Sequence, residues 1–392
     1  MSNPNNVRTA GQQWASLDGL RGVAIGMVVF YHCFYFNPSP GLGAFLDGLR
    51  CAGSLGVLVF FVLSGFLIGL SAFRMQGASD IRSYAIRRGV RIYPPFFFAL
   101  LFTAPFALLW KGEPVSEYVG SSLRYLLTLE HFDRTPVYQN PVYWSLQCEI
   151  HFYLALPIVF LFLRRSSLAM ADIWTTALFL VVPLVIRAGW PPSPLLMGIE
   201  RFDASIRFPR TFDAFGYGMG FACIYLRFRE SPILLKWAGR CCAAGVGLFL
   251  LVCTTSACFE RIWDLSGRGH NLAIAEAIRQ CTCVATFLML FLTLAPSSSR
   301  ARRLFAWGPL VGLGSISYEW FLLHMPIAQF IGERVGLAEG DPFKYALRTV
   351  GPALLSLVLA WVVWLQLSRP LMAYGRSFAS RKSALANPGA NT

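Results

Sequence analysis

Long apolar runs alternate with short polar stretches along most of the chain. Several runs reach about 20 residues, the length that an α-helix needs to cross the hydrocarbon core of a bilayer. They are continuous rather than alternating, which disfavours a transmembrane β-barrel. The pattern predicts an all-α polytopic membrane protein with about ten spans, near residues 17–36, 54–73, 93–110, 143–163, 173–186, 214–226, 241–257, 280–295, 309–331 and 349–367.

Composition agrees with this pattern, because 55% of the 392 residues are hydrophobic and the mean hydropathy is +0.52. These values lie far from those of soluble globular domains. The first apolar run lacks a small-residue cleavage site, so we interpret it as an uncleaved anchor and not a signal peptide. We expect an N-terminal segment over 1–16, a transmembrane domain over 17–367 and a disordered tail over 368–392.

The net charge of +14 is unevenly distributed between the two predicted sides of the membrane. Segments on the side of the termini carry 19 Lys and Arg against three acids, whereas the opposite segments carry 14 of each. The positive-inside rule therefore predicts that both termini are cytoplasmic. The basic residues follow membrane topology, so we do not interpret them as a nucleic-acid surface. The ten cysteines fall mainly in apolar runs without zinc-ligand spacing, and we expect neither a metal nor a disulfide framework.

The first span carries three ionisable residues. Arg21 and His32 are eleven residues apart, so they return to nearly the same helix face, roughly 16 Å apart along the axis. Asp18 lies one turn before Arg21 and can pair with it. Ionisable groups in a membrane helix are costly and mark functional sites by default. The alternative is an interfacial Asp–Arg pair and a histidine bonded to a neighbouring helix.

Arginines precede the third span. Arg88 and Arg91 are three residues apart, just before Tyr93 and two prolines that fit the opening of a helix. Guanidinium groups bind phosphate oxygens bidentately, although a topology anchor beside anionic lipid would use the same residues. In the second span, Ser64 stands among small residues, where close helix packing is a better explanation than a nucleophile.

Two further spans carry polar side chains. In the fourth span, Ser145, Glu149 and Tyr153 share a helix face, behind Trp144 at the interface. Glu149 lies near the expected depth of His32, and a carboxylate at this depth needs a partner; we therefore expect the two to pair. The ninth span adds Ser317, Tyr318 and His324.

Together these motifs resemble the acyltransferase 3 family of integral-membrane O-acyltransferases, over about residues 16–367. The resemblance is carried by Leu17–Gly22 with His32, Phe60–Leu67, Arg88–Pro94, Trp144–Tyr153 and Gly314–His324. It implies transfer of acyl groups from acyl-CoA to hydroxyls of cell-envelope or exported carbohydrates, or of small metabolites, in the bacterial inner membrane. The family's Arg-x10-His and Arg-x-x-Arg positions match Arg21, His32, Arg88 and Arg91. Glu319 and Trp320 depart from the small residue and leucine expected there.

The resulting hypothesis assigns a role to each group. Arg88 and Arg91 hold the phosphates of acyl-CoA, and Arg21 lines the entry. His32 acts as general base on the acceptor hydroxyl or carries the acyl group, and Glu149 orients the imidazole. The donor is expected to be acetyl-CoA and the acceptor a polysaccharide hydroxyl, with no metal required.

Two other classes of protein use similar residues. A transporter or flippase of a lipid-linked sugar would line its pathway with the same polar groups, but no internal repeat is visible. A non-catalytic membrane scaffold would not explain why His32, Glu149 and His324 are buried together.

Overall fold

The computed structural model describes residues 4–34, 42–129, 140–165, 170–189, 211–266, 271–296, 298–336 and 341–375. Within these ranges the chain is helical and contains no strand, so the all-α class is confirmed for the described part. Short turns of 3-10 or π geometry follow α2, α4, α11 and α15. The helices are α1 (Pro4–Cys33), α2 (Leu42–Ala52), α3 (Gly56–Ala72), α4 (Ala78–Pro105), α5 (Val115–Leu126), α6 (Tyr143–Arg165), α7 (Ala171–Gly189), α9 (Phe212–Phe228), α10 (Pro232–Ser266), α11 (Asn271–Met289), α12 (Arg300–Phe305), α13 (Gly308–Ser315), α14 (Ser317–Val335) and α15 (Pro342–Val363).

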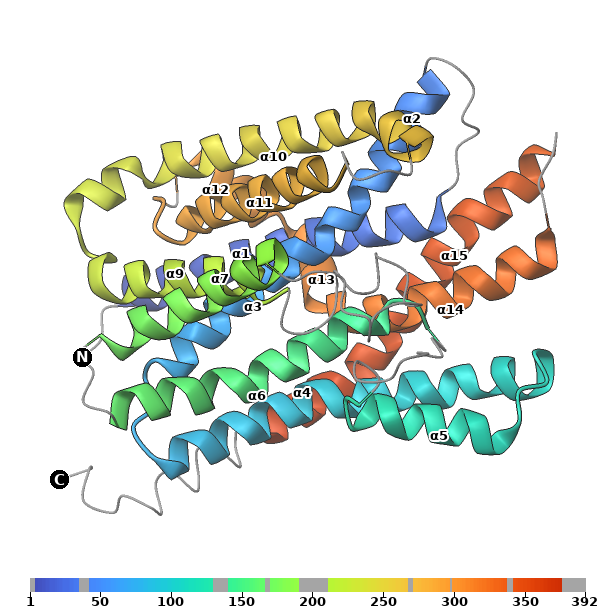
Figure 1. Cartoon of the computed structure of the whole chain (residues 1–392), viewed down its shortest axis with the longest axis horizontal. Coiled ribbons are helices and arrows are strands. Elements are labelled where there is room, and N and C mark those ends of the chain that lie inside the picture. Colours follow the sequence, from blue (N-terminus) through green and yellow to red (C-terminus); the bar gives the residue numbers. More distant parts are fainter. Residues whose placement is uncertain are drawn as a thin grey trace.

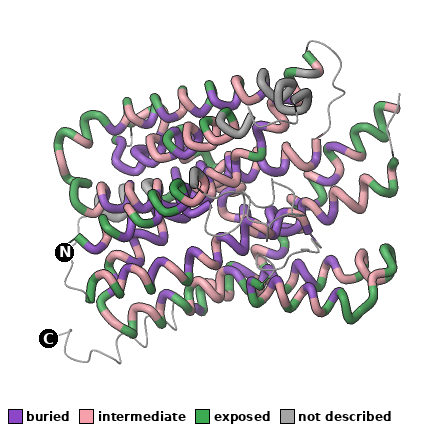
Figure 2. The backbone as a smooth tube through the Cα atoms, viewed as in Figure 1, coloured by how far each residue is buried: buried purple, intermediate pink, exposed green. Residues whose placement is uncertain are grey.

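The long helices lie roughly side by side and form a bundle (Figure 1). In this view α10 and α11 form the upper edge and α4 and α5 the lower edge, with α1, α3 and α9 between them. Buried residues line the inner faces of these helices, and exposed residues lie mainly on the outer ones (Figure 2). The outer faces carry large apolar side chains, such as Ile158, Phe162 and Val358, each more than 60% exposed. Such surfaces suit contact with lipid.

Six helical stretches in the described part are long and apolar enough to cross a membrane, so the protein is a multi-pass membrane protein. They coincide with six of the ten expected spans. The other four expected spans are helical as well, in α1, α7, α9 and the α13–α14 pair, but α9 has only 17 residues and α1 carries charged residues. The six stretches are Phe45–Ala72, Ala78–Trp110, Tyr143–Arg165, Pro232–Ala257, Ile274–Thr293 and Pro342–Gly375.

The third span begins much earlier than expected. Its helix starts at Ala78, so Arg88 and Arg91 lie within α4 and not in a loop before it. Prolines often open a helix, but here Pro94 and Pro95 lie inside one. A hydrogen bond from α14 lies beside them: the Tyr318 hydroxyl donates to the carbonyl of Ile92 at 3.0 Å.

The expected ninth span is two helices, which is a second correction. Ile316 separates α13 from α14, with φ −99° and ψ 6°. The residues before the break have a low helix propensity, since they include Gly312, Gly314 and Ser315. Close packing also requires Gly314, because an added Cβ would lie 1.8 Å from the carbonyl oxygen of Asp18 on α1.

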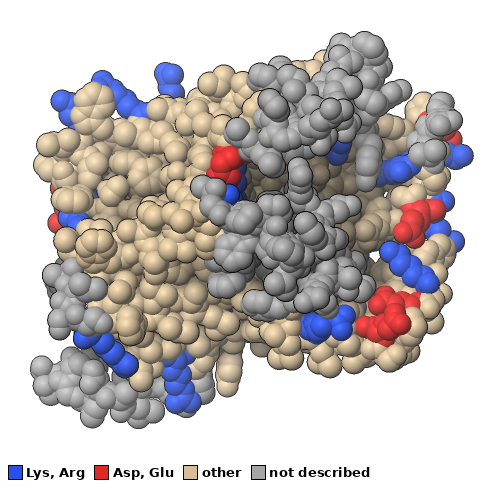
Figure 3. All heavy atoms as spheres, viewed as in Figure 1, with Lys and Arg blue, Asp and Glu red and all other residues tan. Residues whose placement is uncertain are grey.

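The charged residues are distributed differently at the two ends of the bundle. On the face shown in Figure 3, Lys and Arg gather at the left-hand end with few acids, whereas the right-hand end carries both signs. The left-hand end is where α4 and α10 begin (Figure 1). The last described helical stretch continues to Gly375, within the expected tail, and an added Cβ there would be 3.4 Å from Val90 of α4. Residues 376–392 lie outside the described part.

Candidate active site

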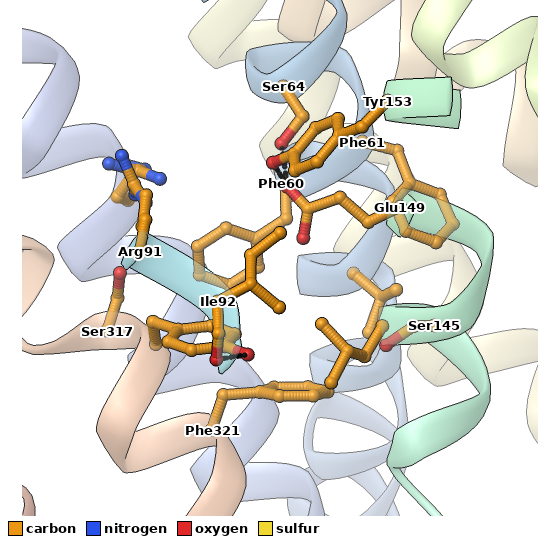
Figure 4. A pocket seen from close by; sticks show the side chains of 14 residues that line it. Phe60, Phe61, Ser64, Arg91, Ile92, Ser145, Glu149, Tyr153, Ser317 and Phe321 are labelled. Carbon is orange, nitrogen blue, oxygen red and sulfur yellow. Dashed lines mark hydrogen bonds between the residues drawn. The ribbon is translucent and has the colours of Figure 1, made fainter. Parts of the chain in front are cut away.

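A pocket opens among α1, α3, α4, α6 and α14, with about 580 Å³ of empty space that includes open solvent at its mouth (Figure 4). Helices from both halves of the chain build it, so it exists only once the bundle has assembled. Eight of the residues that line it are polar or charged, and six are apolar. They are Arg21, Val57, Phe60, Phe61, Ser64, Arg91, Ile92, Ser145, Leu146, Glu149, Tyr153, Ser317, Tyr318 and Phe321.

Two guanidinium groups give the pocket a cationic side. Arg21 pairs with Asp18 as expected, but only loosely, since Nη1 lies 3.8 Å from Oδ1. The Nε of Arg21 is buried without a hydrogen-bond partner among the described residues. Arg91 likewise has no hydrogen bond or ion pair with any residue that the structure describes. Cations that the protein leaves without close partners are suited to bind an anionic ligand.

Arg88 does not line the pocket. Its guanidinium carbon lies over the rings of Tyr84 and Tyr153, 5.7 and 5.5 Å from their centroids. Arg88 therefore supports the pocket wall from behind, while Arg91, one turn later, lines the pocket. Tyr93 is 40% exposed and lies outside the pocket too.

Glu149 accepts two hydrogen bonds on one carboxylate oxygen. Ser64 Oγ donates to Oε1 at 2.5 Å, and the Tyr153 hydroxyl donates to the same atom. The other oxygen points into the pocket (Figure 4). Ser145, Glu149 and Tyr153 all line the pocket, which confirms that they share a face of α6. Small-residue packing beside Ser64 is also confirmed, at Gly65, where an added Cβ would be 2.0 Å from a backbone oxygen of α9.

His32 pairs with another histidine. Its Nδ1 lies 3.1 Å from Nε2 of His324 and 3.0 Å from the carbonyl oxygen of Val28. The expected pairing of His32 with Glu149 is wrong. The two groups were matched by depth, but depth does not determine which helix faces turn toward each other; α6 presents Glu149 to Ser64 on α3.

The histidine pair is outside the pocket lining but adjacent to it. Phe321 lines the pocket, and its ring centroid is 5.8 Å from that of His324, one turn later on α14. Ser317 and Tyr318 line the pocket from the start of the same helix. Phe321 was not among the residues predicted from the sequence, although its spacing from Ser317 and His324 places the three on neighbouring turns. Trp144 contributes indirectly, edge-on to Phe61 at 6.0 Å.

A second charged cluster lies outside the pocket. Asp213 of α9 is fully buried and accepts hydrogen bonds from Arg187 of α7 and from Arg279 and Gln280 of α11. Buried charges need such partners, so this network is explained by helix packing. His151 of α6 also lies outside the pocket lining, and its Nε2 is 3.1 Å from the carbonyl oxygen of Thr128.

The comparisons with known proteins point to one family. The acyltransferase domain family matches residues 14–365. Nodulation protein 10 of Rhizobium leguminosarum bv. viciae is 26% identical over 410 residues, which cover 98% of this chain and 100% of that protein. The peptidoglycan O-acetyltransferase OatA of Listeria monocytogenes is 24% identical over 342 residues, 80% of this chain and 49% of that protein. The O-acetyltransferase OatA of Staphylococcus aureus is 22% identical over 384 residues, 87% and 55% respectively.

The chain thus spans all of the first relative but only about half the length of the other two. No solved structure matches the chain. The family match covers every residue that lines the pocket and includes both histidines of the pair. The protein therefore belongs to the acyltransferase 3 family of membrane acyltransferases.

Proposed function

We propose that this protein transfers an acyl group, in the first instance acetyl, from acyl-CoA to a hydroxyl group of a cell-envelope glycan. The observation that carries the proposal is a pocket with two weakly partnered guanidinium groups, next to a pair of imidazoles of which His324 is fully buried and His32 partly buried. Two of the relatives are named as O-acetyltransferases, one of them of peptidoglycan, which makes peptidoglycan or a related glycan the acceptor to test first.

The donor would bind with its phosphates at Arg21 and Arg91. Phosphate oxygens are strong acceptors for guanidinium groups. Arg21 has only a long ion pair with Asp18, at 3.8 Å, and Arg91 has no ion pair with any residue that the structure describes. Aromatic and aliphatic side chains on the other walls, such as Phe60 and Leu146, would contact the pantetheine arm. Arg88 would act indirectly, by holding the tyrosine that bonds Glu149.

The acid–base step would use His32. The imidazole takes the proton of the acceptor hydroxyl while the hydroxyl oxygen attacks the thioester carbonyl. A C–O bond forms, the C–S bond breaks, and the proton passes to the leaving thiolate, giving an ester and free CoA. A thioester is already activated, so positioning and base catalysis supply much of what the reaction needs.

The orientation in the membrane follows from the charge distribution. We place the basic end of the bundle, where α4 begins, in the cytoplasm of a bacterium, which puts both termini on that side. Acyl-CoA is a cytoplasmic metabolite, so it would reach Arg21 and Arg91 from the cytoplasmic side of the membrane.

Replacing Arg91 by alanine is expected to weaken CoA binding by about 10- to 100-fold, since a hydrogen bond to a charged group contributes about 1.5–3 kcal/mol. Isothermal titration of the purified protein with CoA measures this. The matched control is Arg87→Ala, because Arg87 is exposed on the same helix and does not line the pocket. Equal losses in the two variants would contradict the assignment, as would an Arg91→Ala variant that binds CoA normally.

Replacing Glu149 by glutamine is expected to lower kcat/KM by about 10- to 100-fold, the value of one charged hydrogen bond. The amide keeps an oxygen for Ser64 and Tyr153 but presents a donor to the pocket in place of an acceptor. We expect Ser64→Ala, which leaves the carboxylate in place, to have a smaller effect. Release of CoA thiol with peptidoglycan fragments as acceptor measures both; a fully active Glu149→Gln variant would exclude a role for the charge.

The function as a whole is tested with the purified protein in detergent or vesicles. Acetyl-CoA and peptidoglycan fragments should yield free thiol and a product heavier by one acetyl group, detected by mass spectrometry. Envelope glycans from a deletion strain should lack the same mass. Glycan export without consumption of acyl-CoA would contradict the proposal and favour a transporter.

A further inference from the structure

The two histidines of the pair have matching backbone contacts. The Nδ1 of His32 lies 3.0 Å from the carbonyl oxygen of Val28, and the Nδ1 of His324 lies 3.0 Å from the carbonyl oxygen of Trp320. Each contact spans four residues of its own helix. A carbonyl oxygen only accepts hydrogen bonds, so each Nδ1 must carry the hydrogen. The opposite assignment would place a nitrogen lone pair against a carbonyl lone pair in both rings.

The contact between the rings then has one consistent direction. A neutral His324 with its hydrogen on Nδ1 has a lone pair on Nε2, which is the atom 3.1 Å from Nδ1 of His32. The hydrogen on His32 Nδ1 is therefore shared between Val28 and His324. The Nε2 of His32 is left without a hydrogen and can accept a proton. The carbonyl oxygens can only accept hydrogen bonds, so the two carbonyl contacts determine which ring nitrogen carries the hydrogen. The hydrogen-bond network therefore assigns the tautomer of each histidine.

His324 is itself held firmly in place. Its side chain is fully buried, and the residue that supplies its carbonyl partner is anchored to another helix, since Trp320 Nε1 donates to Ser356 Oγ of α15 at 2.9 Å. The ring of Phe321 is tilted against that of His324, with the ring centroids 5.8 Å apart. A second imidazole placed in this way can orient the first without adding a charge to the interior, which a carboxylate would do at considerable cost.

We propose that His324 is a positioning residue that fixes the Nδ1–H tautomer of His32 and stabilises the imidazolium that forms when Nε2 takes the acceptor's proton. This inference rests on the proposed function. It assigns to a neutral imidazole the orienting role that a carboxylate has in the Ser-His-Asp arrangement. Without His324, the only partner left for His32 Nδ1 among the described contacts would be the carbonyl oxygen of Val28. Val28 lies on the same helix as His32 and fixes the ring less well than a partner on another helix.

The test compares His324→Leu, which removes the acceptor, with His324→Gln, whose side-chain oxygen can accept from His32. The protein is labelled with ¹⁵N-histidine, and His32 is assigned from the signal that His32→Gln loses. We expect the wild type to show a protonated Nδ1 and an unprotonated Nε2 on His32, and the leucine variant to show a mixture of tautomers. An unchanged His32 tautomer in the leucine variant would overturn the inference.

Activity provides a second readout. In the leucine variant kcat should fall by roughly 10- to 100-fold, less than the loss of the base itself, with the KM for acetyl-CoA unchanged. The glutamine variant should recover part of this loss. Similar losses in both variants together with lower thermal stability would show a merely structural role. If acyl transfer is absent even in the wild type, the proposed function fails, whereas the tautomer measurement still decides the inference.

Discussion

Replacing His32 by alanine is expected to lower the rate of acyl transfer by about 10²- to 10⁴-fold, the usual contribution of a positioned general base. The thioester remains activated and the arginines still bind the donor, so CoA binding should be unchanged. The experiment measures thiol release from acetyl-CoA with a glycan acceptor, and CoA affinity in parallel.

The matched control is His151→Gln. This histidine also lies in a membrane span, but its ring contacts the carbonyl oxygen of Thr128 and lies outside the pocket lining. We expect it to keep wild-type activity. Undiminished transfer by a His32→Ala variant that inserts and expresses normally would remove His32 from the mechanism.

Replacing Gly314 by valine is expected to prevent normal folding, or to destabilise the protein by at least about 3 kcal/mol, the upper end for overpacking. The added Cβ would lie 1.8 Å from the backbone oxygen of Asp18, which cannot rotate away. Separating α13 from α1 would also displace the carboxylate that pairs with Arg21. Thermal unfolding in detergent and the yield of monodisperse protein measure the effect.

Gly26→Val provides the control, because it lies on the same α1 helix and an added Cβ there would meet no atom within 4 Å. We expect this variant to fold. A Gly314→Val protein with the wild-type unfolding temperature would mean that α1 and α13 are not packed as the structure has them.

All eight polar or charged residues that line the candidate pocket could be named from the sequence, but not how they pair. Periodicity placed Ser145, Glu149 and Tyr153 on one face, and the structure confirms it. Spacing within a helix is local, so it can be calculated from residue numbers. The partners of His32 and Glu149 depend instead on how each helix rotates about its axis, which is determined by packing across the whole bundle.

The boundaries of the helices were missed for a related reason. Taken alone, Pro94 and Pro95 are good signals for the start of a helix, but in the structure α4 continues across both. A contact from another helix, the hydrogen bond from Tyr318 to the carbonyl of Ile92, lies beside them. The same holds for the break at Ile316, where close approach of two backbones at Gly314 accompanies the end of α13. Such contacts join segments distant in the sequence, and a single sequence does not report them.

Phe321 has a position with a broader meaning, since it borders both the pocket and His324. Under the proposed function, the side chain of Phe321 therefore lies next to both the bound donor and the histidine pair. We therefore expect the size of the side chain at position 321 to influence which acyl chains are transferred, with the arginines and the histidines unchanged.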